Sequence, residues 1–287
     1  MKAVYKRELK SYFTSVTGFL FLAFLMVVVG IYFTTYHLYY GYPYFSYTLS
    51  SSAFIYLLAV PVLTMRVLAE ERHQRTDQLL FTSPKSLTSI VMGKYGALLS
   101  VLLIAVGIFC GYPLILTQFG EVNLAMAYTA ILGFFLLGAA CISVGMFLSS
   151  LTESQVIAAI LTFLTLFFSY MLSTLESFLS PSALTSFLGL AGILFLLFLL
   201  YFFLAKNLVI ALLGLIVSEF LLCLLYAVKS TLFEGLLAKL LSALNLFVHF
   251  GNLANGILDG AEILYFLSVI LFFVFLTIRS LDQRRFS

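Results

Sequence analysis

The chain has 287 residues, of which 63% are hydrophobic and only 9% are charged, and its net charge is +3. A soluble domain has roughly 45–50% apolar and 25% charged residues, so this composition excludes a soluble protein and indicates an integral membrane protein. The length suffices for about eight helices of about 20 residues each, and it leaves no room for a separate soluble domain.

Residues 1–14 predict a short helix that lies flat at the membrane interface. Such a helix directs lysines to anionic headgroups and an aromatic face to acyl chains. The alternative is an ordinary basic flank of the first span. The two predicted faces consist of Lys2, Lys6 and Lys10 on one side, and of Tyr5, Leu9, Tyr12 and Phe13 on the other.

No formal charge occurs from Ser11 to Met65, and this stretch is long enough for two spans. We expect them at about 16–37 and 52–68. The connection between them is rich in tyrosine, which is typical of a segment at the level of the lipid headgroups. Its tyrosines are Tyr39, Tyr40, Tyr42, Tyr44 and Tyr47.

The densest group of charges follows the second span. Six formal charges within 66–77 would cost on the order of 15 kcal/mol or more at the centre of a bilayer, so this segment lies outside it. Because Ser83-Pro84 suits the start of a helix, residues 69–94 predict a helix, a polar turn and a second helix leading through Lys94 into the third span. The plainer alternative is a solvated loop.

Three more spans are expected at about 95–118, 124–149 and 155–175. The sequence Thr152-Glu153-Ser154-Gln155 has the spacing of a capping box and predicts the start of the fifth span.

The apolar stretch 184–228 is too long for one helix, and we divide it at Lys206-Asn207 into a sixth and a seventh span. Residues 229–261 repeat leucine at helical spacing and predict an amphipathic helix on the external membrane surface, with Gly251–Gly260 as the turn back. The eighth span is expected at about 262–278, after a second capping-box-like start at Asp259.

The distribution of lysine and arginine predicts the orientation. With eight spans both termini share one side, and thirteen of the 15 basic residues fall on that side, which leaves Lys229 and Lys239 opposite. The positive-inside rule therefore places both termini and the charged segment in the cytoplasm. The modest net charge reflects this topology and gives no argument for nucleic acid.

Motifs for catalysis or metal binding do not emerge. The three cysteines lack C-x-x-C spacing, the three histidines lie in separate segments, and Gly93-Lys94 lacks the glycine and the hydroxyl residue of a phosphate-binding loop. Glu219, midway along the seventh span, is a functional candidate because an ionisable group there is costly unless neutral, paired or hydrated. The alternative is a protonated carboxyl with a structural role.

Two stretches resemble a known family, the ABC type-2 exporter permeases, and more narrowly its gliding-motility-type branch. The first extends from Met65 through Arg72 and Thr76–Pro84 to Gly93-Lys94-Tyr95, and the second from Ile257 to Arg285. A plain permease of this family has six spans, so the resemblance implies a six-helix core with 184–228 as an added pair. After the basic residues of the charged segment, the branch often has Gly-Thr, whereas this chain has Arg75-Thr76.

The resemblance also implies partners and a contact surface. Such permeases work as dimers, of one chain or of two related chains, with two cytoplasmic ATPase subunits that bind ATP and Mg, so this chain itself binds no cofactor and is not an enzyme. A short helix between spans two and three sits in a groove on the ATPase. Carried over to this chain, the contact surface comprises Glu70, Glu71, Arg72, Arg75, Thr76 and Asp77.

Three function classes remain open. The first is the permease subunit of an ATP-driven exporter in the cell membrane, with a lipid-like, amphipathic or polymeric substrate. The second is a secondary transporter, whose usual signs are several intramembrane charges or matching broken helices. In the third, ATPase motion drives an auxiliary envelope protein or gliding machinery without moving a solute. An intramembrane enzyme is disfavoured because no acid/base or nucleophile constellation is visible.

Overall fold

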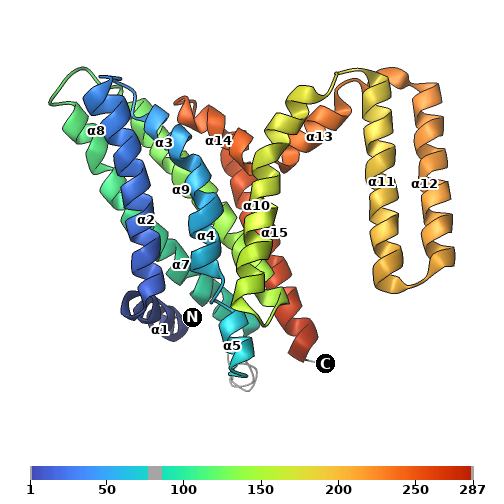
Figure 1. The fold of residues 1–287 in the computed structure, drawn as a ribbon, viewed down its shortest axis with the longest axis horizontal. Helices are drawn as coiled ribbons and strands as arrows, with labels where there is room; N and C mark the ends of the chain where they lie inside the picture. Colours follow the sequence, from blue (N-terminus) through green and yellow to red (C-terminus); the bar gives the residue numbers. More distant parts are fainter. Residues whose placement is uncertain (1, 77–85, 286–287) are drawn as a thin grey trace. The chain divides into compact units, whose positions relative to one another are not determined.

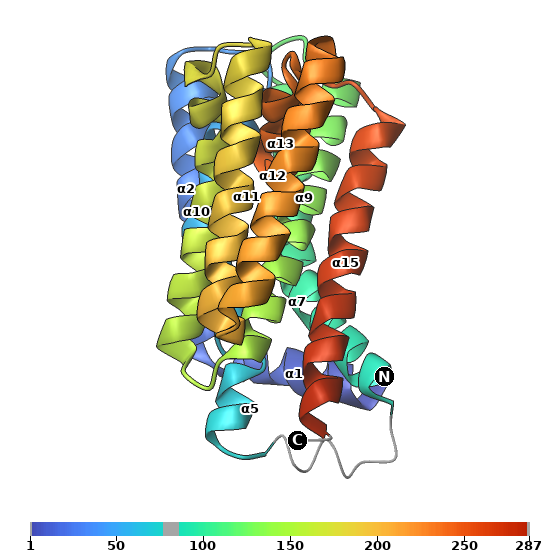
Figure 2. The same cartoon turned by 90° about the vertical axis from the view of Figure 1, so that its right-hand side faces the viewer.

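The computed structural model describes residues 2–76 and 86–285, and every regular element in these ranges is a helix (Figures 1 and 2). Among the described residues, seven helical segments are long and apolar enough to cross a membrane, or eight if the broken pair Ser230–Leu244 and Leu246–Ala254 forms one span. The prediction of an all-α, multi-pass membrane protein is confirmed.

The chain divides into two compact units. Unit 1 consists of Met1–Tyr170 and Leu246–Ser287, and unit 2 consists of Met171–Asn245. The helix pair expected at 184–228 belongs to unit 2. That residues 1–287 act as a single permease domain stays a prediction.

The first part of unit 1 forms two spans with interruptions. The second span begins at Ser46, six residues before the expected start, because polar Ser46–Ser52 is helical rather than part of the tyrosine-rich connection. In chain order the elements are α1 (Lys2–Thr14), α2 (Val16–Phe33), the π-helix η1 (Thr34–Tyr39), α3 (Ser46–Ser52), the 3-10 helix η2 (Ala53–Ile55), α4 (Tyr56–Thr64) and α5 (Ala69–His73).

The rest of unit 1 contains the longest helices. The described residues 87–94, where we expected a helix leading into the third span, form the first two turns of one continuous helix capped by Ser86, whose side chain accepts from the amide of Ser89. The elements are α7 (Leu87–Phe109), α8 (Gly111–Leu116), α9 (Leu124–Leu151), α10 (Gln155–Phe178, shared with unit 2), α14 (Leu246–Ala254) and α15 (Gly260–Arg285).

The start of α10 agrees with the prediction, but its cap does not. Thr152 ends α9 in an extended conformation, and its hydroxyl donates to the carbonyl of Ser154. The amide of Ile157 instead donates to the side chain of Ser154, 3.5 Å away. Ser154 rather than Thr152 therefore caps the helix.

Helix α9 packs against α4, α7, α14 and α15. Two of its glycines permit this close approach. A Cβ at Gly138 would lie 2.7 Å from the hydroxyl of Tyr56, and a Cβ at Gly145 would lie 2.4 Å from Oγ1 of Thr64. Tyr56 is fully buried and donates to the carbonyl of Phe134 at 3.0 Å. Small residues at helix contacts are typical of membrane helices, which associate through close packing.

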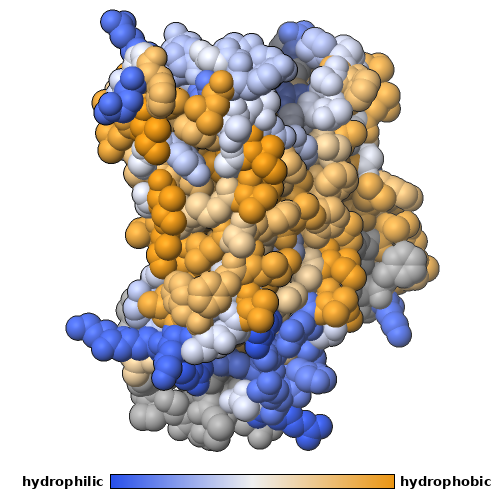
Figure 3. Space-filling model, turned by 60° about the vertical axis from the view of Figure 1, so that its left-hand side comes forward, coloured by the Kyte–Doolittle hydropathy of each residue, from blue (hydrophilic) through white to orange (hydrophobic). Residues whose placement is uncertain are grey.

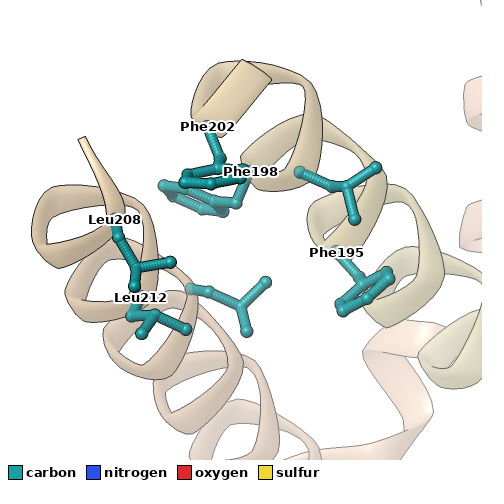
Figure 4. A pocket seen from close by; sticks show the side chains of 7 residues that line it. Phe195, Phe198, Phe202, Leu208 and Leu212 are labelled. Atoms are coloured by element: carbon teal, nitrogen blue, oxygen red, sulfur yellow. The ribbon is translucent and has the colours of Figure 1, made fainter. Parts of the chain in front are cut away.

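Unit 2 is built around an antiparallel helix pair joined at Lys206 and Asn207. Lys206 has a φ of +51°, and the side chain of Asn207 caps the second helix by accepting from the amide of Ile210. Figure 4 shows an apolar cavity of about 140 Å³ between the two helices, lined by phenylalanine and leucine. The elements are α11 (Ala183–Ala205), α12 (Leu208–Val228), the 3-10 helix η3 (Ser230–Phe233) and α13 (Leu236–Leu244).

The segment 229–261 differs from the single amphipathic surface helix that we expected. Asn245, in an extended conformation, ends α13, and α14 begins at the next residue and continues past Gly251 to Ala254. Phe250 and Leu253 of α14 are buried against α9, where a Cβ at Gly133 would lie 2.7 Å from the Cβ of Leu253. The leucine periodicity predicted helix correctly, but it did not reveal that α14 belongs to the core of unit 1.

The polar residues of unit 1 gather at its ends. Figure 3 shows a broad apolar surface along the helices, and strongly hydrophilic side chains at the end where α1 and α5 lie. Helix α1 runs across this end, and both termini lie there (Figures 1 and 2).

Candidate functional site

The charged segment begins at a break in the second span, between α4 and α5. The first amides of a helix need acceptors from outside it, and Leu68 supplies no side-chain cap. The hydroxyl of Ser149, fully buried in the last turn of α9, accepts from the amides of Leu68 and Ala69 at 3.3 and 3.2 Å. It also donates to the carbonyl of Met65. Helix α9 thus caps α5 and fixes its starting point.

Lys94 of α7 is the centre of the site. Its side chain is only 1% exposed, and its ammonium group donates two hydrogen bonds and forms one further ion pair. Nζ lies 2.9 Å from the carbonyl oxygen of Val67, 2.9 Å from Oε1 of Glu71 and 3.2 Å from Oε1 of Glu8. A buried ammonium is tolerated only when paired and hydrogen-bonded, so these contacts bind α1, α5 and α7 together.

Helix α1 contributes a second cation to the same cluster. Nη2 of Arg7 lies 2.7 Å from Glu8 and 3.0 Å from Glu71. Burial raises the pKa of the Glu8 carboxyl, but the charges of Lys94 and Arg7 outweigh this effect, and the pKa ends below its usual value. Glu8 is therefore ionised at neutral pH. We call Arg7, Glu8, Glu71 and Lys94 the lysine cluster.

The aromatic face of α1 contacts protein, which corrects the expectation that it faces acyl chains. The hydroxyl of Tyr5 lies 2.8 Å from that of Ser100 in α7. Tyr12 is buried, and its hydroxyl donates to the carbonyl of Leu63 in α4. These tyrosines hold α1 against two spans, and their hydroxyl groups have partners that acyl chains would not provide. The position of α1 at the membrane interface stays a prediction.

Two further predicted contact residues form ion pairs within the chain. Glu70 accepts two hydrogen bonds from Arg66, at 2.7 and 2.9 Å, across one helical turn. Arg72 donates to Glu153, just before α10, at 2.9 Å. Glu71 and Arg75 have the same spacing, but Glu71 points to the lysine cluster instead. The ion pair at this spacing is that of Arg66 and Glu70.

Helix α5 ends in a left-handed residue. Arg75 has a φ of +55°, its amide donates to the carbonyl of Arg72, and the amide of Thr76 donates to that of Glu71. This is the Schellman arrangement, in which glycine is usual at the left-handed position. The side chain of Arg75 is exposed, as are those of His73 and Gln74. Asp77 lies outside the described residues.

The structure thus separates the predicted contact residues into two groups. Glu71 faces inward to the lysine cluster, whereas Arg75 faces solvent together with His73 and Gln74. Sequence reasoning missed the central role of Lys94. A signal was available, because Lys94 shares a helical face with Ile90, Val91 and Leu98, which are all buried, and a lysine on such a face needs acceptors.

Glu219 lies apart from this site, in α12 of unit 2. It is partly exposed, and no hydrogen bond or ion pair joins it to another of the described residues. It lies about 17 Å from the start and about 14 Å from the end of its helix, at 1.5 Å per residue. Among the described residues no group of three or more His, Cys, Asp or Glu is arranged to hold a metal ion.

The fold and this site define a multi-pass membrane protein in which a short polar helix is tied to several spans. A family model described as "ABC-2 family transporter protein" matches residues 27–201, which is more than half of the chain. The chain therefore belongs to the ABC-2 transporter family and is a permease subunit of an ABC transporter. No curated protein and no solved structure matches the chain.

Proposed function

We propose that a separate cytoplasmic ATPase drives this permease by binding at α5. The observation that carries this proposal is the buried Lys94, which joins α5 to α1 and α7, while Ser149 of α9 caps the same helix. Coupling needs a rigid element that is continuous with the helices that move. A displacement of α5 would be transmitted to three other helices, because α7 and α9 each contribute a buried polar contact to it and Arg7 of α1 pairs with Glu71.

The exposed and the inward residues would have different roles in this coupling. Arg75, with His73 and Gln74, would meet the ATPase, and Glu70, Arg72, Thr76 and Asp77 would complete the contact surface as the family resemblance implies. Glu71 would act as a positioning residue, since its carboxylate already pairs with Lys94 and Arg7. ATP and Mg would bind to the ATPase and not to this chain.

The orientation and the assembly are part of the proposal. The end of unit 1 that carries both termini and α5 is strongly hydrophilic (Figure 3), and the basic residues of α1 and α5 lie there, which favours the cytoplasmic side. A second permease, identical or related, would complete the transporter. The sequence of the charged segment supports placement in the gliding-motility-type branch.

The proposed substrate is lipid-like, amphipathic or polymeric, and the proposed direction is export. Support comes from residues 39–47, which run from the end of η1 through the connection to the start of α3, where exposed tyrosine rings lie within about 6 Å of one another and no charged residue occurs. Aromatic rings of this kind favour the boundary between lipid and water, where an amphipathic molecule would leave the protein. The rings belong to Tyr39, Tyr40, Tyr42, Tyr44 and Tyr47.

Two variants separate the roles, measured on the full chain co-purified with its ATPase in lipid nanodiscs. Arg75→Glu should reduce the bound ATPase about fivefold or more, because a charge at the contact is reversed. Glu71→Gln should leave the bound amount within about twofold but lower ATP turnover about fivefold, because α5 is no longer fixed to α7.

The matched control is Lys206→Glu, which reverses an exposed basic residue of similar backbone conformation outside the site. It should change neither quantity by more than about twofold. Normal ATPase binding and normal turnover in both Arg75→Glu and Glu71→Gln would contradict the proposal.

We also propose that Glu219 forms a contact with another membrane-embedded chain. None of the described residues satisfies its carboxyl, and an unsatisfied ionisable group at this depth is costly. Replacement by glutamine keeps the hydrogen-bonding capacity, whereas leucine removes it. Glu219→Leu should therefore weaken assembly of the purified transporter more than Glu219→Gln, and equal assembly of both variants would contradict this role.

A further inference from the structure

A second polar cluster joins α14 to α15 in unit 1. Nδ1 of His249 lies 2.5 Å from Oε2 of Glu262, and Nδ2 of Asn252 donates to Oε1 of the same carboxyl at 2.7 Å. The ring of His249 also stacks on Tyr265, with 3.7 Å between centroids. We call His249, Asn252 and Glu262 the histidine cluster. From sequence, Glu262 was expected to complete a capping box at Asp259, but its carboxyl turns to α14 instead.

The histidine cluster lies far from the lysine cluster. Helix α14 packs against α9 at Gly133 and Phe134, whereas α5 is capped by Ser149 of the same helix. Fifteen residues of α-helix between Phe134 and Ser149 span about 23 Å. The two clusters therefore occupy opposite ends of unit 1 (Figure 1).

The contacts define which nitrogen of His249 can take up a proton. Nδ1 is engaged with Glu262, whose residue is only 9% exposed, whereas Nε2 is buried and has no hydrogen-bond partner among the described residues. Histidine is the side chain that ordinarily changes charge between pH 5 and 8. A proton taken from solvent would bind at Nε2 and leave the Nδ1 contact in place.

Proton uptake would change the strength of the link between the helices. With neutral His249, one neutral donor faces the carboxylate of Glu262. With protonated His249, the same contact becomes an ion pair, and charge-assisted hydrogen bonds are roughly twice as strong as neutral ones. Because both side chains are largely shielded from solvent, screening weakens this gain less than at an exposed pair.

The neighbouring titratable groups do not replace this pair. Tyr265 stacks on the ring, and Asp259, which precedes α15, uses its carboxyl to accept from the amide of Ala261. Gly133 and Phe134 of α9, which contact α14, do not titrate, and Tyr170 of α10 packs on Phe247 of α14. Helix α3, which also packs against α14, contains one titratable residue, Tyr47.

We propose that His249 and Glu262 form a proton-binding site that holds α14 against α15 more firmly when the proton is bound. The ligand is a proton from the aqueous phase at the end of unit 1 opposite α5. In a permease, the acidity on that side would then set how freely α14 moves. The proposal does not depend on ATPase coupling, because the contact lies within this chain and can be measured without the ATPase.

Hydrogen exchange of the α14 amides in the purified full chain tests the proposal, at about pH 5.5 and about pH 8. The key variant is His249→Gln, which can still donate a hydrogen bond but does not titrate. Comparison at equal pH removes the intrinsic effect of pH on exchange. In wild type, α14 should exchange about fivefold more slowly than in the variant at the lower pH, and within about twofold of it at the higher pH.

His73→Gln is the matched control, since it removes an exposed histidine of α5 at the other end of unit 1. It should exchange like wild type in α14 at both pH values. If His249→Gln does not fold, wild type alone decides, through the exchange of α14 relative to that of α9 residues 127–146. A ratio that is the same at both pH values, or faster exchange of α14 at the lower one, would overturn the proposal.

Discussion

Helices α9 and α12 are both long and apolar, yet the protein uses them in opposite ways. In an 18-residue apolar stretch of α9, 72% of the residues are buried, whereas no residue is buried in the corresponding stretch of α12. Helix α9 has glycines where Tyr56 and Thr64 approach, while α12 presents large side chains such as Val217 and Phe220 outward. Apolar composition brings a helix into the membrane, and small residues decide whether others can pack around it.

Polar groups follow the same division. In unit 1 the buried Lys94 donates two hydrogen bonds and forms one further ion pair, and the buried hydroxyl of Ser149 caps α5. In unit 2 the carboxyl of Glu219 has no partner among the described residues. Unit 1 therefore pairs its buried ammonium internally, whereas unit 2 presents apolar surface and, midway along α12, a carboxyl that other molecules can contact.

The largest expected effect comes from breaking the lysine cluster. Lys94→Met removes the buried cation that pairs with Glu8 and Glu71 and leaves them with the exposed Arg7, and breaking a buried ion pair on one side costs about 3–5 kcal/mol. We expect a much lower thermal midpoint in detergent. The measurement is the reaction of a thiol dye with Cys141, which is fully buried in the folded chain.

Acid should weaken the same cluster in wild type. Because the pKa of Glu8 is lowered in the folded chain, its contribution to stability is present above the usual carboxyl pKa of 4.5 and is lost as the pH falls below it. Lys94→Met should lack this pH-dependent component. Equal acid sensitivity of the two proteins would show that Glu8 gains nothing from Lys94.

Alanine substitutions at two glycines compare the units directly. Gly138→Ala places a methyl group 2.7 Å from Tyr56 and 2.9 Å from Leu102, and overpacking of this kind typically costs about 1–3 kcal/mol. At Gly192 of α11, a Cβ meets nothing within 4 Å. Gly192→Ala should therefore be neutral or stabilise by up to about 1 kcal/mol through helix propensity.

The measurement is again the thermal midpoint of Cys141 exposure for Gly138→Ala, and the midpoint of helix loss by circular dichroism for Gly192→Ala. If Gly138→Ala is as well tolerated as Gly192→Ala, close packing does not distinguish α9 from the hairpin of α11 and α12.

The smallest effect is expected at the end of α5. Arg75→Gly relieves a left-handed conformation that costs a non-glycine residue about 1–2 kcal/mol, offset in part by the greater freedom of glycine in the unfolded chain. We expect slower hydrogen exchange of the α5 amides by about two- to fivefold, together with weaker ATPase binding because the charge is lost. Faster exchange would mean that a contact of the Arg75 side chain stabilises α5 by more than the free energy that its left-handed conformation costs.

Most of the helices could be predicted from sequence because hydrophobic length reports the membrane environment directly. The boundaries failed where local polarity and structure disagree. Ser46–Ser52 looked like part of a loop, yet it is helical, with Ser52 donating to the carbonyl of Leu49 and Thr48 in contact with His37. The segment 229–261 looked like a surface helix, because a leucine repeat does not tell a lipid-facing side from the core-facing side of α14.

The candidate site was only partly predictable for a similar reason. The charge density of α5 marked a segment outside the bilayer, but charge alone does not say which residues face inward. Glu71 and Arg75 have the spacing of an intrahelical pair, whereas the cations that pair with Glu71 come from α1 and α7, which are distant in sequence. The presence of Arg75 where the branch often has glycine could be interpreted only from the structure, because the backbone at Arg75 has a positive φ.

Site-directed photo-crosslinking tests the central claim most directly. A photoreactive amino acid at Gln74, exposed on α5, should crosslink to the ATPase subunit in the assembled transporter, and the same group at Asn255, exposed just after α14, should not. Crosslinking of the ATPase from position 255, or an active ATP-hydrolysing complex that yields no crosslink from position 74, would contradict the account.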